Sequence, residues 1–363
     1  MKSQRSSIPA RRRRTRQISV GKVKIGGGAP ISVQSMTKTD TRDVDGTILQ
    51  IRRLEAAGCD LVRLAVVDQE ACIALRRIKE ASSIPLIADI HFDHRLALDA
   101  LDAGVDGLRI NPGNIKGKEK IKEIARAAKE RGAPIRIGVN AGSLEKEFLK
   151  TYGHPTAEAM VESCLRHVNM LEALDFHQIK LSVKASSVVR TIEAYQLLSE
   201  RTEYPLHVGV TEAGPLMAAT VKSAVGLGIL LGQGIGDTIR VSMTGDPAEE
   251  IQIGWAILRA LNLGGRGIDL VSCPTCGRCA TDMVGVVAEV EQRLRHIIVP
   301  LTVAVMGCEV NGPGEAREAD VGVALGKGWG LLMKKGKIVR KYPESRLVDM
   351  LVAEVEKMAR EER

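Results

Sequence analysis

Short β-branched runs alternate with longer amphipathic stretches along most of this chain. Apolar residues recur with the 3.6-residue period of a helix in "GTILQIRRLEAAG", "EKIKEIARAAKERG" and "AEAMVESCLRHVNMLEAL". Between such stretches the pattern predicts eight strands, in "ISVQSM", "LVRLAVV", "PLIADIHF", "GLRINPGN", "IRIGVNAG", "QIKLSVKAS", "LHVGVTEAG" and "TIRVSMTGDP". Gly58, Gly104 and Gly132 each come one or two residues before a strand, as glycines that end helices do.

Eight strand–helix units match an α/β fold of the TIM (β/α)8 barrel type in number and in length. A doubly wound open sheet competes, but no G-x-G-x-x-G turn follows the first strand. We therefore predict a basic N-terminal arm and lead-in at residues 1–29 and a substrate-binding TIM barrel at residues 30–263. The glycine-rich segment "LGGRGIDLVSCP" marks the start of a second domain, residues 264–363. Its two strand-like runs and a helix from about Ser345 predict a small α+β domain.

Composition excludes a membrane-spanning protein. Hydrophobic residues make up 44% of the chain, and no apolar run approaches the ~20 residues of a membrane span. The N-terminus "MKSQRSSIPARRRRTRQ" is basic, but no apolar segment follows it, so it does not match a secretory signal. A cytoplasmic protein is the expectation.

The net charge of +8 suits an anionic partner, either nucleic acid or a phosphorylated small molecule. Arg11–Arg14 and Arg16 could contact nucleic acid, but only nine residues are aromatic, which is few for a protein that stacks bases. We expect a solvated, disordered arm, and a pocket for a small anion.

Polar side chains follow the predicted strands at the places where a TIM barrel carries its active site. They are Arg63, Asp89, His91, Arg109, Asn111, Arg136, Asn140, Lys184, Glu212, Arg240 and Ser242. Any one of these residues alone is equally explained as a residue at the barrel rim or as a member of a salt bridge. Together they predict a mouth for a compact substrate with more than one phosphate, because arginine forks match phosphate oxygens.

Two strand ends carry candidate acid–base groups. Asp89 and His91 lie at i and i+2 on one side of a strand, where they could bind a metal, orient a hydroxyl, move a proton or form a structural pair. Glu212 in "GVTEAG" is a candidate acid.

Seven cysteines divide into two groups. Cys59, Cys72 and Cys164 lie in helix-like surroundings and are expected to be buried. The other four lie in the last quarter of the chain, as Cys273, Cys276, Cys279 and Cys308.

Zinc, a redox dithiol and an iron–sulfur cluster all use C-x-x-C. The single Cys308 disfavours a zinc ribbon, and a redox dithiol would not need it. The C-x-x-x-C-x-x-C spacing of radical enzymes that use S-adenosylmethionine is absent. An iron–sulfur cluster fits best, and on spacing alone all four thiolates would hold it.

The motifs "CPTCGR" and "GCEVNGPGEA", after "ADIHF", "LRINPGN", "IRIGVN", "SVKAS" and "GVTEAG", resemble those of the 4-hydroxy-3-methylbut-2-en-1-yl diphosphate synthase family in its two-domain bacterial form. The resemblance implies an oxidoreductase of the non-mevalonate isoprenoid pathway. Its substrate would be 2-C-methyl-D-erythritol 2,4-cyclodiphosphate, opened reductively with loss of a hydroxyl as water to give (E)-4-hydroxy-3-methylbut-2-enyl diphosphate. Reduced flavodoxin or ferredoxin would supply two electrons, one at a time.

The resemblance also implies roles for individual residues. A [4Fe-4S] cluster would be held by Cys273, Cys276, Cys308 and Glu315, which leaves Cys279 spare. A carboxylate ligand marks one iron, where a substrate oxygen can displace it and bind. The diphosphate would be held by Arg63, Arg109, Arg136 and Lys184. The polyol would be lined by Asn140 and by the catalytic candidates Asp89, His91 and Glu212.

The resemblance further implies a homodimer in which one subunit's cluster domain caps the partner's barrel. Two rival interpretations remain at this point. One is an electron carrier or a zinc-stabilised nucleic-acid-binding protein. The other is a pterin-type barrel with a structural cluster.

Overall fold

The computed structural model describes residues 11–111, 114–115, 117–276, 279, 281–308 and 312–361, without the side chains of Pro313 and Glu315. The chain divides into two compact units, Met1–Gly264 and Gly265–Arg363. Within the described ranges, no helix is both long and apolar enough to cross a membrane.

The first unit is a TIM barrel, as predicted. Its eight parallel strands are β3 (Ser32–Met36), β4 (Leu61–Ala65), β5 (Leu86–Ile90), β6 (Gly107–Ile110), β7 (Ile135–Asn140), β8 (Ile179–Lys184), β9 (His207–Val208) and β10 (Thr238–Ile239). They are ordered β8-β7-β6-β5-β4-β3-β10-β9, and a parallel bridge between Leu181 and Leu206 joins β8 to the segment before β9. The last two strands are short, so this side of the barrel has few ladder hydrogen bonds.

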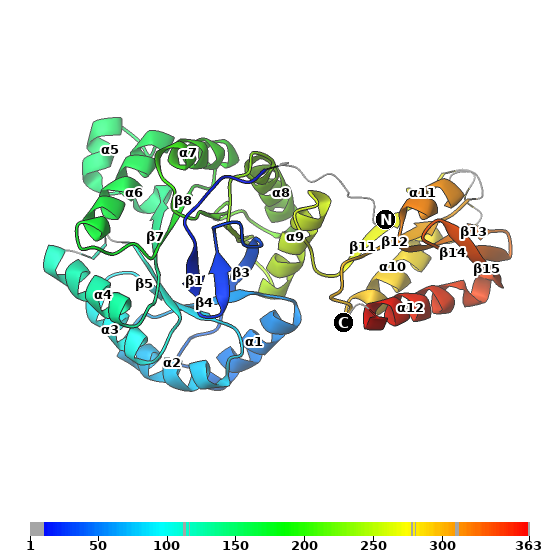
Figure 1. The fold of residues 1–363 in the computed structure, drawn as a ribbon, viewed down its shortest axis with the longest axis horizontal. Helices are drawn as coiled ribbons and strands as arrows, with labels where there is room; N and C mark the ends of the chain where they lie inside the picture. The colour runs from blue at the N-terminus through cyan, green and yellow to red at the C-terminus, as the bar shows by residue number, and fades with distance from the viewer. Residues whose placement is uncertain are drawn as a thin grey trace. The chain divides into compact units, whose positions relative to one another are not determined.

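Helices surround the strands of this unit (Figure 1). They are α1 (Val44–Ala56), α2 (Gln69–Ala81), α3 (His94–Asp102), α4 (Lys118–Glu130), α5 (Lys146–Tyr152), α6 (Ala157–Glu172), α7 (Val188–Arg201), α8 (Leu216–Gly232) and α9 (Pro247–Ala260), with a 3-10 turn η1 (Ala141–Ser143). Gly58, Gly104 and Gly132 have φ values of 90°, 87° and 63°, the left-handed conformation of a residue that ends a helix. The helix ends predicted from these glycines are confirmed.

A hairpin closes the N-terminal end of the barrel. Strands β1 (Ile18–Val20) and β2 (Val23–Ile25) pair antiparallel, and Ile18, Val20 and Ile25 pack against Leu61 and Ile87 near the starts of β4 and β5. The barrel interior is therefore sealed with apolar side chains at this end. The opposite end, where the strands finish, is the end that active sites use in this fold.

The described part of the basic arm is not a solvated, disordered segment, so that expectation is wrong. Arg12 Nη2 donates to Asp237 Oδ1 at 2.9 Å, and Arg13 donates to the carbonyl oxygens of Thr202 and Tyr204. Arg16 lies 4.7 Å from the centre of the Tyr204 ring. These arginines are used as anchors to the barrel, because buried carbonyls and a buried carboxylate lie within their reach.

The second unit is a five-stranded sheet with three helices. Its elements are β11 (Ile268–Ser272), α10 (Met283–Leu294), β12 (Leu301–Met306), α11 (Gly312–Glu318), β13 (Val321–Gly326), β14 (Trp329–Lys334), β15 (Lys337–Pro343) and α12 (Glu344–Glu361). Strands β11, β12 and β13 are parallel, and β13, β14 and β15 are antiparallel. One face packs against α10 and α12, and the other packs against α11.

This unit has more strands than the two runs predicted. The long run from residue 319 to 342 divides into three strands, because Gly328 and Gly336 turn the chain with φ values of 72° and 77°. Strand β11 lies within the glycine-rich segment that we predicted only as the start of the second domain. The α+β class of the unit is as predicted.

Candidate active site

The inner face of the barrel is polar, which is unusual for a fold whose interior is normally filled with branched apolar residues. Along β7 and β8 the side chains alternate, and the apolar members Ile135, Ile137, Ile179 and Leu181 belong to the core shared with the helices. The alternate positions point into the barrel. They are Arg136, Gly138 and Asn140 on β7 and Lys180, Ser182 and Lys184 on β8.

Asp89 on β5 is the carboxylate around which the barrel's arginines gather. Its side chain is 3% exposed, Oδ1 accepts a hydrogen bond from Arg109 Nη1 at 2.9 Å, and Oδ2 lies 3.3 Å from Arg63 Nε. His91 Nε2 lies 2.6 Å from the same nitrogen of Arg109. The structure therefore brings four of the predicted site residues together at the ends of β4, β5 and β6.

The electrostatics of this group fix its charge states at neutral pH. Burial acts to raise the pKa of Asp89, but Arg63 and Arg109 together more than offset it, so the pKa lies well below its ordinary value. Burial lowers the pKa of Arg63 to about 9, with Asp89 opposing. Burial likewise lowers the pKa of His91. Asp89 is thus ionised and His91 neutral at pH 7.

The neutral imidazole of His91 has a defined tautomer. A guanidinium can only donate hydrogen bonds, so Nε2 of His91 must accept the one from Arg109. The ring proton is then on Nδ1. The His91 side chain is 45% exposed, which leaves it reachable by a substrate.

Arg136 and Lys184 are buried basic groups, and no carboxylate among the described residues forms an ion pair with either. Arg136 is 3% exposed, and its Nε and Nη1 have no hydrogen-bond partner in the described part of the chain. Lys184 is 6% exposed. Burial is the main cause that lowers the pKa of both groups, and neighbouring cations lower it further. Groups of this kind require an anion or ordered water, because an unpartnered buried polar atom is costly.

Two glycines make room for these cations. A Cβ atom at Gly138 would lie 2.8 Å from Arg109 Nε, and one at Gly209 would lie 2.9 Å from Lys184 Nζ. At Gly209 the added Cβ would also clash with the backbone carbonyl oxygen of Arg240. Glycine at these two positions therefore leaves the space that the side-chain nitrogens of Arg109 and Lys184 occupy.

The remaining predicted barrel residues lie at the rim. Asn140 ends β7 and is the register partner of Lys184. Glu212 follows β9, is exposed, and has a φ of 53°, a left-handed conformation that is rare for a residue other than glycine. Backbone strain of this kind at a rim position is typical of functional loops.

Sequence reasoning missed several polar residues of the interior. Glu250 on α9 is 1% exposed and contacts Ser35, Lys38 and Arg240 at 2.9, 3.3 and 3.5 Å. No strand-end signal marks it, since it comes from a helix. Lys180, His207 and Gln34 are also buried on barrel strands. Lys180 lies at an even spacing from Lys184 on β8, and the alternation along this strand was the signal that could have identified it.

The cysteines of the second unit gather at one edge of its sheet. Strands β11 and β12 are parallel, with Ser272 opposite Val305, and Cys273 and Cys308 follow these strands directly. Cys273 N donates to Val305 O at 3.0 Å, and Cys276 is exposed. None of the seven cysteines forms a disulfide, and Cys59, Cys72 and Cys164 are buried as predicted.

Cys279 is placed differently from its neighbours. Its Sγ lies 3.3 Å from the carbonyl oxygen of Thr281, and a Cβ at Gly307 would lie 2.8 Å from it. The thiol is thus packed against the backbone that leads to Cys308.

The fourth proposed ligand, Glu315, belongs to α11, but its side chain lies outside the described part of the structure. Ala316, the next residue, packs in the same cluster as Cys273 and Met306. The helix that carries Glu315 therefore lies beside Cys273. Among the side chains that the structure describes, no group of three histidines, cysteines or acids is close enough to hold a metal ion.

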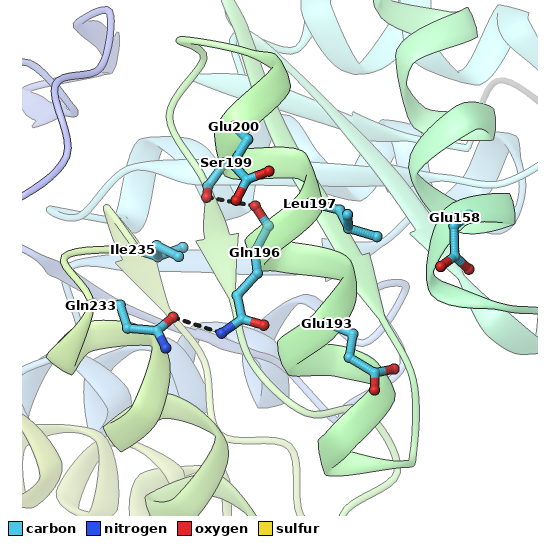
Figure 2. Close-up of a pocket in the computed structure, with 8 residues that line it drawn as sticks. All are labelled: Glu158, Glu193, Gln196, Leu197, Ser199, Glu200, Gln233 and Ile235. Carbon is cyan, nitrogen blue, oxygen red and sulfur yellow. Dashed lines mark hydrogen bonds between the residues drawn. The ribbon is translucent and has the colours of Figure 1, made fainter.

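A separate cavity of about 610 Å³ lies outside the barrel, over α7 and the end of α8 (Figure 2). Its lining includes Glu158, Glu193 and Glu200, and Gln196 Nε2 donates to Gln233 Oε1 at 3.0 Å. Three carboxylates and no cation make it unsuited to a phosphorylated ligand. The interior of the barrel is the better candidate.

The fold and the site define a two-domain TIM-barrel protein whose interior is lined with cations and whose second domain carries cysteines at one sheet edge. Residues 15–255 match the GcpE TIM-barrel domain, and residues 269–357 match the GcpE protein C-terminal domain. The chain belongs to the GcpE family of enzymes.

Curated relatives agree over nearly the whole length. The 4-hydroxy-3-methylbut-2-en-1-yl diphosphate synthase (flavodoxin) of Geobacter sulfurreducens is 63% identical over 96% of this chain and 99% of its own. The protein of that name from Symbiobacterium thermophilum is 60% identical over 96% of this chain and 95% of its own. The family inferred from the motifs is therefore confirmed.

Proposed function

We propose that this protein reductively opens 2-C-methyl-D-erythritol 2,4-cyclodiphosphate and removes one hydroxyl as water, giving (E)-4-hydroxy-3-methylbut-2-enyl diphosphate in the non-mevalonate isoprenoid pathway. The observation that carries the proposal is a set of buried basic groups on the barrel strands for which the described structure has no carboxylate partner. Arg136 and Lys184 are buried, and both lie beside the Asp89–Arg109 pair. A diphosphate supplies the acceptors and the negative charge that these groups lack.

The barrel residues have distinct roles in this proposal. Arg63, Arg109, Arg136 and Lys184 bind the phosphate oxygens. Asp89 orients Arg63 and Arg109 through the contacts described above. His91 has its proton on Nδ1 and can donate it in a hydrogen bond to a substrate oxygen, while Asn140 lines the polyol.

Glu212 is the proposed acid for the departing hydroxyl, because it lies at the rim after β9 and its side chain is exposed. A hydroxyl leaves more readily as water, so a group that delivers a proton to it lowers the barrier. The strained backbone at this position supports a functional role.

The residues of the second unit fit a [4Fe-4S] cluster. Cys273, Cys276 and Cys308 would bind it with thiolate sulfur, the ligand that iron–sulfur clusters use. Glu315 would be the fourth ligand, carried by α11 beside Cys273. When bound, such a cluster supplies electrons singly, which a two-electron reduction with a stepwise donor requires. Cys279 is not a ligand in this proposal.

Reduced flavodoxin is the proposed electron donor, as the names of the relatives state for those proteins. We also propose a homodimer in which the second unit of one subunit caps the barrel of its partner.

The test is an anaerobic assay of the cluster-loaded protein with the cyclodiphosphate and reduced flavodoxin. Formation of (E)-4-hydroxy-3-methylbut-2-enyl diphosphate, dependent on both additions, is the expected result. Failure of a protein with full iron content to form this product would contradict the proposal.

A further inference from the structure

A second polar layer lies inside the barrel below the proposed diphosphate site. Lys180, the inward residue nearest the start of β8, is the register partner of Arg136 and is 2% exposed. His207 on β9 is fully buried, and Gln34 on β3 is 1% exposed. Within the described residues, Lys180 Nζ, both ring nitrogens of His207 and both side-chain polar atoms of Gln34 have no hydrogen-bond partner.

The carboxylates near this layer are already engaged. Asp89 contacts Arg63 and Arg109, and Glu250 contacts Lys38 and Arg240. Asp237, which precedes β10, accepts hydrogen bonds from Arg12 Nη2, from Thr15 Oγ1 and from the backbone of Leu206. In the described structure, no carboxylate is therefore left to neutralise Lys180.

Cations face Lys180 from several elements. Arg136 lies beside it on β7, Arg63 faces it from β4, Lys184 lies farther along β8, and the buried imidazole of His207 lies on β9. The carboxylate of Asp237 acts in the opposite direction and raises the pKa of Lys180, but burial and Arg136 have larger effects. Burial lowers the pKa of Lys180 well below its ordinary value, and Arg136 lowers it further. The pKa of His207 is lowered in the same way by burial, Lys184 and Arg136.

Lys180 is the group whose protonation state can change under the influence of burial and the neighbouring positive charges. A guanidinium keeps its proton in proteins, whereas a buried ammonium releases its proton when desolvation and like charges disfavour it. When no ligand is bound, the neutral amine is therefore the more stable form of Lys180.

We propose that Lys180 is a positioning residue whose charge follows the occupancy of the mouth: it is a neutral amine in the empty barrel and takes up one proton from solvent when a diphosphate binds above it. The inference rests on the proposed function, because a dianionic ligand must occupy the mouth. Lys180 does not touch the ligand. Its protonation adds positive charge beside Arg136 only when a bound ligand supplies negative charge to balance it.

The chemistry of the ligand makes the proton count interpretable. Each phosphorus of a cyclic diphosphate carries one strongly acidic oxygen, so the ligand is a dianion near neutral pH and does not itself take up a proton. Any proton taken up on binding belongs to the protein. Since the occupied state holds more protons than the empty one, binding is expected to strengthen as pH falls, by up to about tenfold per pH unit for each proton.

The experiment is isothermal titration calorimetry of the cluster-loaded protein with 2-C-methyl-D-erythritol 2,4-cyclodiphosphate, without an electron donor. Titrations at one pH in two buffers that differ in ionisation enthalpy give the number of protons taken up. We expect about one proton or more for the wild-type protein. Lys180→Met is always neutral and Lys180→Arg is always charged, so both variants should take up about one proton fewer while still binding.

Lys24→Met is the matched control, because Lys24 is an exposed lysine on β2, at the closed end of the barrel. It should take up as many protons as the wild type. Wild-type binding without proton uptake, or unchanged uptake in both Lys180 variants, would overturn the inference alone. Absence of any binding by the wild-type protein would overturn the proposed function as well.

Discussion

Arg109 Nη1 donates a 2.9 Å hydrogen bond to Asp89 Oδ1 between two side chains that are 5% and 3% exposed, on neighbouring strands of the barrel. The two residues are register partners of β5 and β6. The pair holds one guanidinium in place beside Arg136 and Lys184, which have no carboxylate partner among the residues that the structure describes. Breaking the pair should therefore change both the free energy of unfolding and the geometry of the anion site.

Asp89→Asn should strongly destabilise the barrel, because it leaves Arg63 and Arg109 buried without a counter-charge. We expect a loss of about 3–5 kcal/mol in the free energy of unfolding, measured by denaturant titration. Asp102→Asn is the control, because it breaks an exposed ion pair with Arg131 and should cost at most about 1 kcal/mol. Equal effects of the two substitutions would contradict this account of the pair.

The same pair predicts a pH dependence of stability. The pKa of Asp89 in the folded protein is lowered by Arg63 and Arg109 against the opposing effect of burial. The resulting stabilisation is complete above the unfolded-state pKa of about 3.9 and is lost as pH falls through the lower folded-state pKa. The difference in unfolding free energy between wild type and Asp89→Asn should shrink below about pH 4. A pH-independent difference would exclude this linkage.

Arg136→Ala should weaken binding of the cyclodiphosphate and leave the absorption spectrum of the cluster unchanged. The substitution removes donors that have no other acceptor in the described structure. Loss of charge-assisted hydrogen bonds corresponds to about 1.5–3 kcal/mol, which is roughly 10–150-fold in Kd. Arg131→Ala, at an exposed ion pair, is the control. Unchanged KM and kcat in Arg136→Ala would remove this residue from the site.

Arg12→Ala should destabilise the first unit, although Arg12 lies far in sequence from the ends of the barrel strands. Arg12 bonds to the buried carboxylate of Asp237 and to the backbone oxygens of Ala29 and Gly236. We expect a loss of about 1.5–3 kcal/mol on thermal or chemical unfolding. Arg11→Ala, at an exposed neighbouring position, should have no measurable effect. Equal stability of both variants would show that the arm does not anchor the barrel.

Much of this architecture could be predicted from the sequence because strands and helices have different periods. The alternation in "IRIGVN" and "IKLSVK" predicts which side chains point inward, and the structure has Arg136 and Lys184 on that face. The anchoring of the arm could not be predicted, since Arg12 meets Asp237 across 225 residues of sequence. Glu250 was missed for the same reason: its contact with Ser35 spans 215 residues, and nothing local marks it.

The second unit was harder to predict from pattern. Strand β11 follows a glycine-rich segment, and its burial is only partial in the described structure, so its apolar signal is weak. The three strands from Val321 to Pro343 form one continuous run of apolar and basic residues that only the turn glycines divide.

Glu212→Gln should retain the fold and slow turnover by roughly 10²–10⁴-fold, as expected for loss of a general acid. Because Glu212 is exposed, the free energy of unfolding should not change. Glu212→Gly should even stabilise the protein slightly, since glycine adopts a φ of 53° without strain. A near-normal kcat for Glu212→Gln would make this residue structural.

We propose that three thiolates and one carboxylate hold the cluster and that Cys279 is not a ligand. Its Sγ lies by the carbonyl oxygen of Thr281 in its own loop, whereas Cys273 and Cys308 follow neighbouring parallel strands. Cys279→Ser should therefore keep four irons per chain and most of the activity. Cys308→Ser should lose the cluster, because a hydroxyl poorly replaces a thiolate.

The most direct measurement is iron content and turnover for Cys279→Ser and Glu315→Ala, prepared side by side under anaerobic conditions. We expect full iron content and substantial activity for Cys279→Ser, and reduced iron content with collapsed turnover for Glu315→Ala. An inactive, colourless Cys279→Ser protein beside a fully active Glu315→Ala protein would contradict this proposal and would assign the cluster to four thiolates.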